Sequence, residues 1–590
     1  MKRPAHYLLC LFLHLMLIFL LGKGLFVIYN HHIESLAVAD FLRIWWHGAL
    51  LDVSTVAMAM VVPILCCTFL TERFRPILVS YFIILGLTVG IVICADTIMY
   101  EFWQFKLSAV VLSYAASPEG TTNSVSMGFL ATRFLMILCT ILLTALPPIL
   151  LLPRTFQRPR PYGVLLLAII ILAMPTNVGS CYYPATLFHC HAATNPVFRF
   201  FTSFGDTRTF SQADSSAPIN CPVGRADGNF TAVKAYRTSS SITDTLLSTT
   251  RPNILFVQLE SFGGKFVEEL GGIPGVASNF SRLIPDGIFW DHYYSSSFRT
   301  DRGTVCAYSG TISLPTVSPM KEVRLHDRLP SLAQSMRQAN YQTGYLYGGA
   351  MTNMGKYRYL SDMGFESLMD DTYFTSDELN SSWGAHDSTS AQKVYHTIAE
   401  IDTAARWFMV YQTISSHEPW DVPYHRLDDK VLNAFAYTDQ CLGDLIDSLH
   451  TLPVWDNLLV IVIPDHGYLY QQTYDDSEFF HSPMLWLGGA IREPRRISKL
   501  MNQSDIAATL LAQMQLPHDN YPWSRNVFSP DYQPFVYCNY PAGLLYKDET
   551  GETLYDLSAE ESLPVGIPAD SVRLCKALSI LRQSYRELNN

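Results

Sequence analysis

Hydrophobic residues are distributed unevenly along the chain. Up to about residue 180 they form long apolar runs, whereas from Arg251 onward short apolar runs alternate with polar segments. An α-helix needs about 20 apolar residues to cross the hydrocarbon core of a bilayer. Five runs come near that length: Tyr7–Ile28, Ala49–Leu70, Ile77–Ile98, Met127–Leu152 and Tyr162–Val178. The pattern therefore predicts a polytopic, five-helix transmembrane domain over residues 1–180.

Basic residues predict the orientation of this domain. If the five runs alternate across the membrane, most basic residues near their ends lie on one side of it. These residues are Lys2, Arg3, Arg73, Arg75, Arg154, Arg158 and Arg160. Cytoplasmic loops carry an excess of Lys and Arg, so that side is predicted to be cytoplasmic. Trp45, Trp46 and Trp103 lie near the ends of runs on the other side, as interfacial aromatics do. An odd number of spans then places everything after about residue 180 outside the cytoplasmic membrane, in the periplasm or the extracellular space.

The rest of the chain is predicted to form a linker and a globular domain. Residues 181–250 are rich in Ser, Thr and Asn, which is typical of an extracytoplasmic linker, and residues 251–590 have a globular composition. Buried strands are expected at Ile254–Leu259, Thr343–Tyr347, Phe408–Thr413 and Leu458–Ile463, and helices at Leu332–Ala339, Val431–Leu449 and Ile506–Met514. Alternating strands and helices favour an α/β fold with a largely parallel central sheet and helices on both faces.

Charge and cysteine content exclude some classes of protein. The formal net charge is −11 and no Lys/Arg-rich face is apparent, so nucleic acid is not an expected partner. No Cys/His cluster has the spacing of a structural zinc site. In an oxidising compartment a bridge between Cys181 and Cys190 is permitted, and the sequence leaves that pairing open.

Polar side chains follow three of the predicted strands. In open α/β sheets the functional site lies beyond the carboxyl ends of the strands. Glu260 ends the first strand, Asp465 and His466 end another, and Ser416-His417 follow a third. Each residue alone has an ordinary structural explanation, such as capping a helix or forming a turn. Together, two carboxylates and an imidazole favour a site for one divalent cation of the Mn²⁺ or Zn²⁺ type, with Ca²⁺ a poorer fit.

Thr300 is the candidate nucleophile. It lies in a hydroxyl-rich segment just before a plausible short helix, where backbone N–H groups and the helix dipole favour a phosphate, and a metal ion would lower the pKa of the hydroxyl. Arg299 or Arg302 could hold phosphate oxygens. The alternative is that Ser and Thr here only cap the helix, and without the predicted metal site that alternative would be preferred.

These motifs resemble the lipoteichoic acid synthase type of the sulfatase and alkaline phosphatase superfamily. The resemblance rests on Asn253–Ser261, a threonine placed like Thr300, Trp383-Gly384 followed by Asp387, Ser416-His417 and Asp465-His466-Gly467. It implies that one divalent ion, Mn²⁺ in the first place with Zn²⁺ or Mg²⁺ as alternatives, is bound by Glu260, Thr300, Asp465 and His466. It also implies that Thr300 is the nucleophile, that His417 is catalytic, and that substrate is contacted by His417, Lys356, Arg302, Trp383 and Asp387.

The sequence also departs from related patterns. A sulfate-ester hydrolase would carry a Cys/Ser-x-Pro-x-Arg motif, but here Thr300 is followed by Asp301 and Arg302. Where phosphoglycerol-transferring relatives have arginine the nearest match is Lys356, and Met354 and Gly349 stand in place of a tryptophan and an acid. The transferred group therefore stays open.

The expected function is metal-dependent transfer of phosphoglycerol or a similar head group. The donor would be a membrane phospholipid and the acceptor an envelope glycan or lipid, with a phospho-threonine intermediate. The alternatives are a phosphoethanolamine transferase, a sulfatase-like phosphodiesterase or sulfuric ester hydrolase, and a non-enzymatic pseudoenzyme that binds the envelope.

Overall fold

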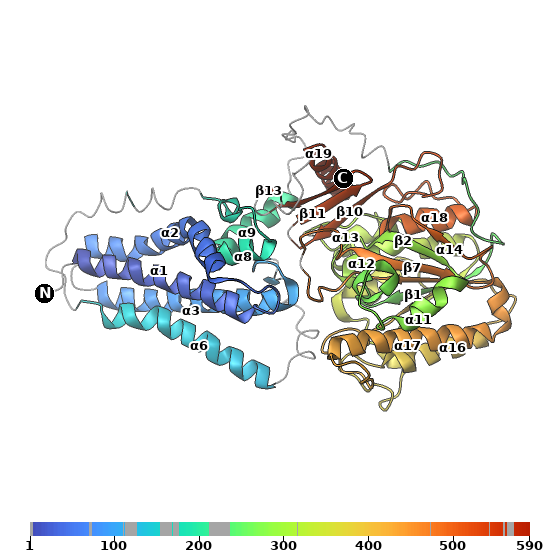
Figure 1. The fold of residues 1–590 in the computed structure, drawn as a ribbon, viewed down its shortest axis with the longest axis horizontal. Helices are drawn as coiled ribbons and strands as arrows, with labels where there is room; N and C mark the ends of the chain where they lie inside the picture. The colour runs from blue at the N-terminus through green and yellow to red at the C-terminus, as the bar shows by residue number, and fades with distance from the viewer. Residues whose placement is uncertain are drawn as a thin grey trace.

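The computed structural model shows a helical bundle beside an α/β domain, with the N-terminus at the far end of the bundle (Figure 1). It describes residues 4–69, 74–109, 111–112, 127–153, 168, 176–211, 236–315, 317–472, 474–541, 543–557, 561–562 and 571–589.

Four long helices form the bundle: α1 (Pro4–Tyr29), α2 (Val38–Phe69), α3 (Phe74–Trp103) and α6 (Met127–Leu150). Each is long and apolar enough to cross a membrane. They confirm four of the five predicted spans. The fifth, Tyr162–Val178, falls almost entirely outside the described residues.

The outer surface of the bundle is apolar. Along α1, the side chains at every fourth position are 48–58% exposed, namely Leu9, Leu13, Leu17 and Leu21. Because residues four apart lie on one face of a helix, these leucines form a continuous stripe. An apolar stripe of this length is stable only against lipid or another apolar surface. The chain is a membrane protein.

Inside the bundle two lysine–aspartate pairs are buried. Lys23 of α1 contacts Asp52 of α2, and Lys106, which follows α3, contacts Asp96 of α3. The other carboxylate oxygen of Asp52 accepts a hydrogen bond from the side-chain amide of Asn195 at 2.8 Å. Each carboxylate is thus matched by a cation of the chain itself.

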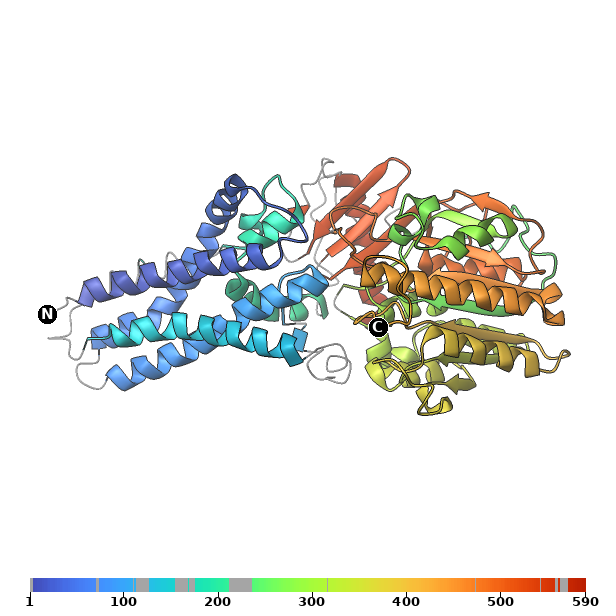
Figure 2. The ribbon, with the colours of Figure 1, turned by 60° about the horizontal axis from the view of Figure 1, so that its bottom comes forward.

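Two short helices lie where the bundle faces the α/β domain: α8 (Leu187–Ala193) and α9 (Pro196–Ser211). Both views show them at this end of the bundle, beside the C-terminal sheet (Figures 1 and 2). They belong to the segment expected to be a linker, so part of that segment is helical. The permitted bridge is not formed, since Cys181 and Cys190 are free thiols.

A large sheet forms the centre of the α/β domain. Its strands are β1 (Asn253–Leu259), β2 (Ile288–Tyr294), β3 (Gln342–Tyr347), β4 (Ser367–Met369), β5 (Trp407–Gln412), β6 (Leu458–Pro464), β7 (His481–Leu487), β8 (Arg495–Ile497) and β9 (Met501–Asn502). The order is β4-β3-β5-β1-β6-β7-β2-β8, and β9 also pairs with β2. Pairing is parallel except for β7, which runs antiparallel to β6 and β2. The largely parallel sheet predicted from the sequence is confirmed.

Helices cover both faces of this sheet (Figure 1). On one face lie α12 (Thr300–Ser309), α14 (Leu332–Gln338), α15 (Lys356–Asp362) and α18 (Ile506–Gln513), whose apolar residues share a core cluster with Phe256 and Ile461. On the other lie α11 (Ser278–Leu283), α16 (Asp387–Glu400) and α17 (Lys430–His450), which pack around Leu255 and Val460. Neighbouring residues of one strand thus belong to opposite cores, as the alternation of side chains in a strand requires.

The strands and helices predicted from periodicity agree with the structure to within two residues. A 3₁₀ turn over Gln503–Asp505 directly precedes α18. A capping box begins that turn. The Asn502 side chain accepts a hydrogen bond from the backbone N–H of Asp505, and the Asp505 side chain accepts one from the backbone N–H of Asn502.

The C-terminal region forms a second, antiparallel sheet that was not predicted. It contains β10 (Phe535–Tyr540), β11 (Gly543–Asp548), β12 (Gly551–Asp556) and β13 (Glu561–Ser562). Helix α19 (Ser571–Asn589) packs on it through a cluster of its own. These strands mix polar and apolar residues over short lengths, which makes their periodicity hard to recognise in the sequence.

Candidate active site

The predicted metal ligands leave two neighbouring strands at the same edge of the sheet. β1 and β6 are parallel and Leu259 lies opposite Pro464. The next residues, Glu260 and Asp465, therefore emerge side by side, and His466 follows. Ligand atoms of Glu260, Asp465 and His466 all lie within 4.8 Å of one another. The structure thus brings together the three strand-end residues singled out in the sequence.

Thr300 approaches this group from the first turn of α12. Its hydroxyl oxygen lies 3.4 Å from both carboxylate oxygens of Glu260 and 3.5 Å from Nε2 of His466. The helix comes close because residue 303 is glycine: a Cβ there would lie 2.0 Å from the carbonyl oxygen of Asp465. The threonine hydroxyl therefore points into the carboxylate–imidazole group, beside the free N–H groups of a helix start.

The electrostatics of the group suit a divalent cation. Asp465 is fully buried, and its Oδ2 has no hydrogen-bond partner among the residues that the structure describes. Burial and the neighbouring Glu260 carboxylate raise the pKa of Asp465. Burial alone would also raise the pKa of Glu260, but His417, His466 and Lys356 hold that pKa below its usual value.

Two buried carboxylates, an imidazole and a hydroxyl converge here, and none of the four groups is a permanent cation. Their oxygens and nitrogen fit a metal such as Mn²⁺ or Zn²⁺. Such an ion, when bound, lowers the pKa of the threonine hydroxyl and withdraws charge from a phosphate oxygen.

Hydrogen bonds from neighbouring polar residues orient the carboxylates. The backbone N–H of Ser261 donates to Oδ1 of Asp465 at 2.7 Å, and the Ser261 hydroxyl donates to Glu260 at 3.0 Å. The Thr413 hydroxyl accepts from the Glu260 N–H at 2.9 Å, and the Gln412 amide donates to Glu260 Oε2 at 3.4 Å. Gln412 and Thr413 were not predicted as site residues from the sequence. Their signal was their position, since Gln412 and Thr413 end the strand next to β1.

Lys356 lies on the same network. Its ammonium donates to the Gln412 side-chain oxygen at 2.8 Å and stands 3.9 Å above the ring centroid of Tyr347. Burial lowers the pKa of Lys356 to about 8, although Glu260 and Asp465 oppose the shift. One cation is therefore held close to the metal group by a glutamine that also touches Glu260.

His417 and Trp383 pack together at the entrance of the site. Their ring centroids are 4.4 Å apart, and Nδ1 of His417 lies 2.9 Å from the carbonyl oxygen of Glu418. His417 also lowers the pKa of the Glu260 carboxyl group. Partial exposure of both rings leaves them accessible to a ligand.

Asp387, expected to contact substrate, lies beside the loop before His417. It is fully buried, and Oδ1 accepts backbone hydrogen bonds from Ile414 at 2.7 Å and Ser415 at 3.2 Å. Oδ2 accepts from the Thr438 hydroxyl at 2.7 Å. Burial raises the pKa of Asp387 to about 6. A contact between Asp387 and substrate stays a prediction.

Arg302 is buried beneath the start of α12. Its guanidinium donates to the carbonyl oxygens of Leu314 at 3.2 Å and Pro315 at 3.4 Å, and lies 3.7 Å from Asp301. These contacts anchor the nucleophile segment. A direct role of Arg302 toward phosphate stays a prediction.

Backbone strain is concentrated around the site. Three residues other than glycine have positive φ close to site residues: Ser261 (57°) follows Glu260, Met354 (56°) precedes Lys356 by two residues, and Trp420 (59°) follows His417 by three. Such conformations cost free energy and persist where the surrounding structure enforces them, often at functional sites.

Comparison with known proteins agrees with this geometry. The sulfatase family model matches residues 252–516, which contain the whole metal group and Thr300. This part of the chain is therefore similar to the sulfatase family.

Among curated relatives, "Phosphoglycerol transferase I" of Xanthomonas campestris pv. campestris (strain B100) is 22% identical over 454 residues, 72% of this chain and 58% of the relative. The protein of the same name from Xanthomonas axonopodis pv. citri (strain 306) is 22% identical over 48% of this chain and 44% of its own length. The chain thus spans about half the length of these relatives.

Two solved structures share the fold. A protein of the alkaline phosphatase superfamily from Vibrio parahaemolyticus has a TM-score of 0.52 at 22% identity, covering 60% of this chain and 95% of that one. The lipoteichoic acid synthase LtaP from Listeria monocytogenes has a TM-score of 0.51 at 15% identity, covering 61% and 98%.

Proposed function

We propose that this protein is a metal-dependent phospho-head-group transferase of the cytoplasmic membrane, with its catalytic domain on the outer side. It takes the head group from a membrane phospholipid and gives it to a hydroxyl of an envelope glycan or lipid. The group moved is phosphoglycerol or a close analogue, because the curated relatives are named phosphoglycerol transferases.

One observation carries this proposal: the Thr300 hydroxyl lies within 3.5 Å of Glu260 and His466 at the start of α12. A hydroxyl in that position is a nucleophile whose alkoxide form is stabilised. In the part of the chain that the structure describes, one group of residues has metal-ligand geometry. One ion and a side-chain nucleophile favour a covalent route over direct attack by two-metal-activated water.

The reaction follows in two balanced halves. Thr300, having given its proton to solvent, forms a bond from Oγ to the phosphorus of the donor phosphodiester. The bond from phosphorus to the diacylglycerol oxygen breaks, and His417 gives a proton to that oxygen. In the second half the acceptor hydroxyl passes its proton to His417 and bonds to phosphorus. The bond to Thr300 breaks, and Thr300 takes a proton from solvent.

Side chains around the metal group have separate tasks in this scheme. Lys356 holds a phosphate oxygen or the polar end of the head group, since its ammonium lies beside Gln412 and close to Glu260. Asp387 keeps His417 in place through Ile414 and Ser415. Trp383 shields the imidazole from one side at 4.4 Å.

Two observations support the location of the catalytic domain. The Lys/Arg-rich ends of the apolar runs fall on one side, which the positive-inside rule assigns to the cytoplasm. Cys575 is disulfide-bonded, which is typical of an oxidising compartment outside the cytoplasm.

Trapping of the intermediate tests the function. The full chain in detergent is incubated with phosphatidylglycerol and its metal, quenched in acid and digested, and the peptide containing Thr300 is weighed. A phosphoglycerol adduct is expected, and Thr300→Ala should carry none. A phosphoethanolamine adduct formed from phosphatidylethanolamine alone would select the other head group. Full turnover of Thr300→Ala without any adduct would refute the mechanism.

A further inference from the structure

The outer end of α3 touches the segment that carries the nucleophile. The guanidinium carbon of Arg299 lies 5.4 Å from the ring centroid of Trp103, the last residue of α3. Arg299 is the N-cap of α12 and directly precedes Thr300. A tryptophan at the end of a membrane helix, where the head groups of lipids lie, is thus stacked on the residue next to the nucleophile.

Further contacts hold the two regions together beside this pair. The Tyr182 hydroxyl donates to Asp556 at 2.7 Å, and the Leu187 N–H donates to Asp475 at 2.9 Å. Leu187 also belongs to the apolar cluster of Phe298, the residue before Arg299. The nucleophile segment is therefore packed against the bundle as well as against its own domain.

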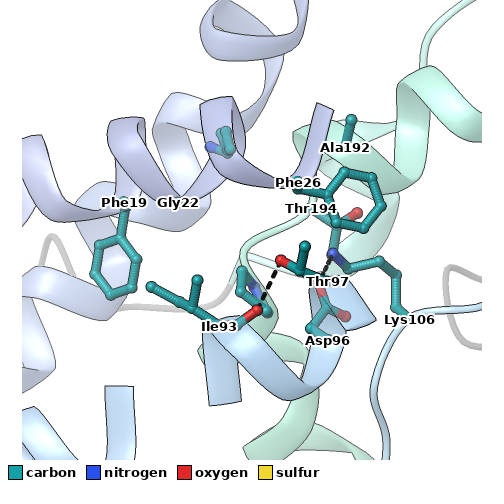
Figure 3. Close-up of a pocket in the computed structure, with 11 residues that line it drawn as sticks. Phe19, Gly22, Phe26, Ile93, Asp96, Thr97, Lys106, Ala192 and Thr194 are labelled. Carbon is teal, nitrogen blue, oxygen red and sulfur yellow. Dashed lines mark hydrogen bonds and ion pairs between the residues drawn. The ribbon is translucent and has the colours of Figure 1, made fainter. Parts of the chain in front are cut away.

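A buried ion pair between Asp96 and Lys106 holds the turn that follows α3. Gln104 adopts a positive φ of 48° and turns the chain back. Asp96 then accepts from the N–H of Leu107 at 2.8 Å and pairs with Lys106, whose ammonium stands 4.4 Å from the ring centroid of Phe26 (Figure 3). A buried ion pair with a backbone hydrogen bond gives this turn one defined conformation, so Trp103 is presented rigidly.

A carboxylate at the outer end of α3, that of Glu101, acts on the loop that follows His417. Glu101, two residues before Trp103, accepts from Tyr29 at 2.8 Å. Burial raises the pKa of Glu418, with Glu101 adding to the shift and His417 and Arg299 opposing it. The bundle end thus lies close enough to the His417 loop to act on its charges.

We infer that the outer end of α3 is the membrane-side wall of the active site, and that Trp103 is a specificity-determining residue for bilayer-embedded donors. Its ring lies 5.4 Å from the guanidinium carbon of Arg299, the residue directly before Thr300. A lipid head group at the membrane surface would meet this pair before the metal group. This inference rests on the proposed transferase function.

Kinetics with two donors test the role of Trp103 in the full chain reconstituted with metal. The donors are phosphatidylglycerol in vesicles and water-soluble bis(4-nitrophenyl) phosphate. Trp103→Ala should lower kcat/KM with vesicles about tenfold more than kcat/KM with the soluble diester, the size of one lost cation–π contact in a partly desolvated site. Trp103→Phe should keep most of the vesicle activity. Trp46→Ala, at an interfacial tryptophan that is 75% exposed, is the matched control and should change neither.

An equal loss on both donors, or no loss with vesicles, would overturn the inference. Absence of transfer by the wild-type protein would instead contradict the proposed function, so the contact is also tested without turnover. With p-benzoylphenylalanine at position 103, illumination in vesicles should cross-link to the peptide containing Phe298, whereas position 46 should not. Cross-links from position 103 to lipid alone would refute the inference that the outer end of α3 lines the active site.

Discussion

The bundle and the α/β domain bury carboxylates in different ways. In the bundle, Asp52 and Asp96 each meet a lysine of the chain, so their charge is compensated on folding. At the strand ends, Glu260 and Asp465 share one site, and within the described part of the chain Oδ2 of Asp465 has no hydrogen-bond partner. Burying two carboxylates together is unfavourable unless a cation joins them. In the bundle the carboxylate charge is compensated by the protein itself, whereas at the strand ends it is compensated only when a cation binds.

This difference predicts which changes abolish function and which abolish stability. Substitutions at the strand-end group should remove activity from a folded protein. Substitutions at the lysine–aspartate pairs should weaken the folded bundle.

The largest effect is expected at the nucleophile. Thr300→Ala should lower head-group transfer by about 10³-fold or more, because it removes the hydroxyl that the proposed reaction uses as its nucleophile. Thr300→Ser keeps the hydroxyl and should retain measurable turnover. Thermal unfolding should change little in both variants, since one hydroxyl contributes little to the core. Transfer of radiolabelled glycerol to lipid acceptors measures the effect, and equal activity of the two variants would contradict it.

Loss of a metal ligand should come next. Asp465→Ala should lower bound metal and lower turnover by more than about 100-fold, because the remaining ligands hold the ion weakly. Metal content by mass spectrometry and turnover are measured on the same sample. Asp439→Asn is the matched control: Asp439 is also buried and accepts from the N–H groups of Asn279 and Phe280, far in sequence from the site. It should lower the melting temperature and leave the metal content intact.

The bundle pair should respond in the opposite way. Lys23→Met leaves Asp52 buried without its cation, and should reduce the free energy of unfolding by about 3 kcal/mol. The double variant Lys23→Met with Asp52→Leu should recover most of that loss, since it removes both charges. Thermal unfolding in detergent measures the change, and transfer per folded molecule should stay normal. A single variant as stable as the wild type would show that the pair is not structural.

The smallest effect is a change in pH dependence. Burial lowers the pKa of Lys356 to about 8, so the ammonium is charged below that pH and loses its proton above it. If Lys356 binds the head group, KM should rise several-fold between about pH 7 and pH 9. Lys356→Arg stays charged and should remove this rise, and Lys356→Met should have a high KM at every pH. A KM that is flat with pH in the wild type would show that Lys356 does not hold substrate.

Much of the molecule could be predicted from the sequence because its signals are local. Runs of about 20 apolar residues indicate membrane helices through length alone, and strand-length runs ending in Glu260 or Asp465-His466 indicate ligands at a sheet edge. The parallel sheet and the approach of these residues follow from that alternation. The C-terminal sheet escaped prediction because its strands mix polar and apolar residues.

Tertiary structure decided what local patterns cannot contain. The buried carboxylate of Asp387 accepts hydrogen bonds from Ile414 and Ser415, and Arg302 donates to the carbonyls of Leu314 and Pro315. The sequence indicated neither set of partners. The partner of a buried charge depends on segments that meet only on folding. The same holds for Lys23 with Asp52, and for Trp103 with Arg299, which are 196 residues apart in the chain. Residue type and spacing determined which groups this protein could use, and long-range packing decided which of them face the metal group and which only hold the fold.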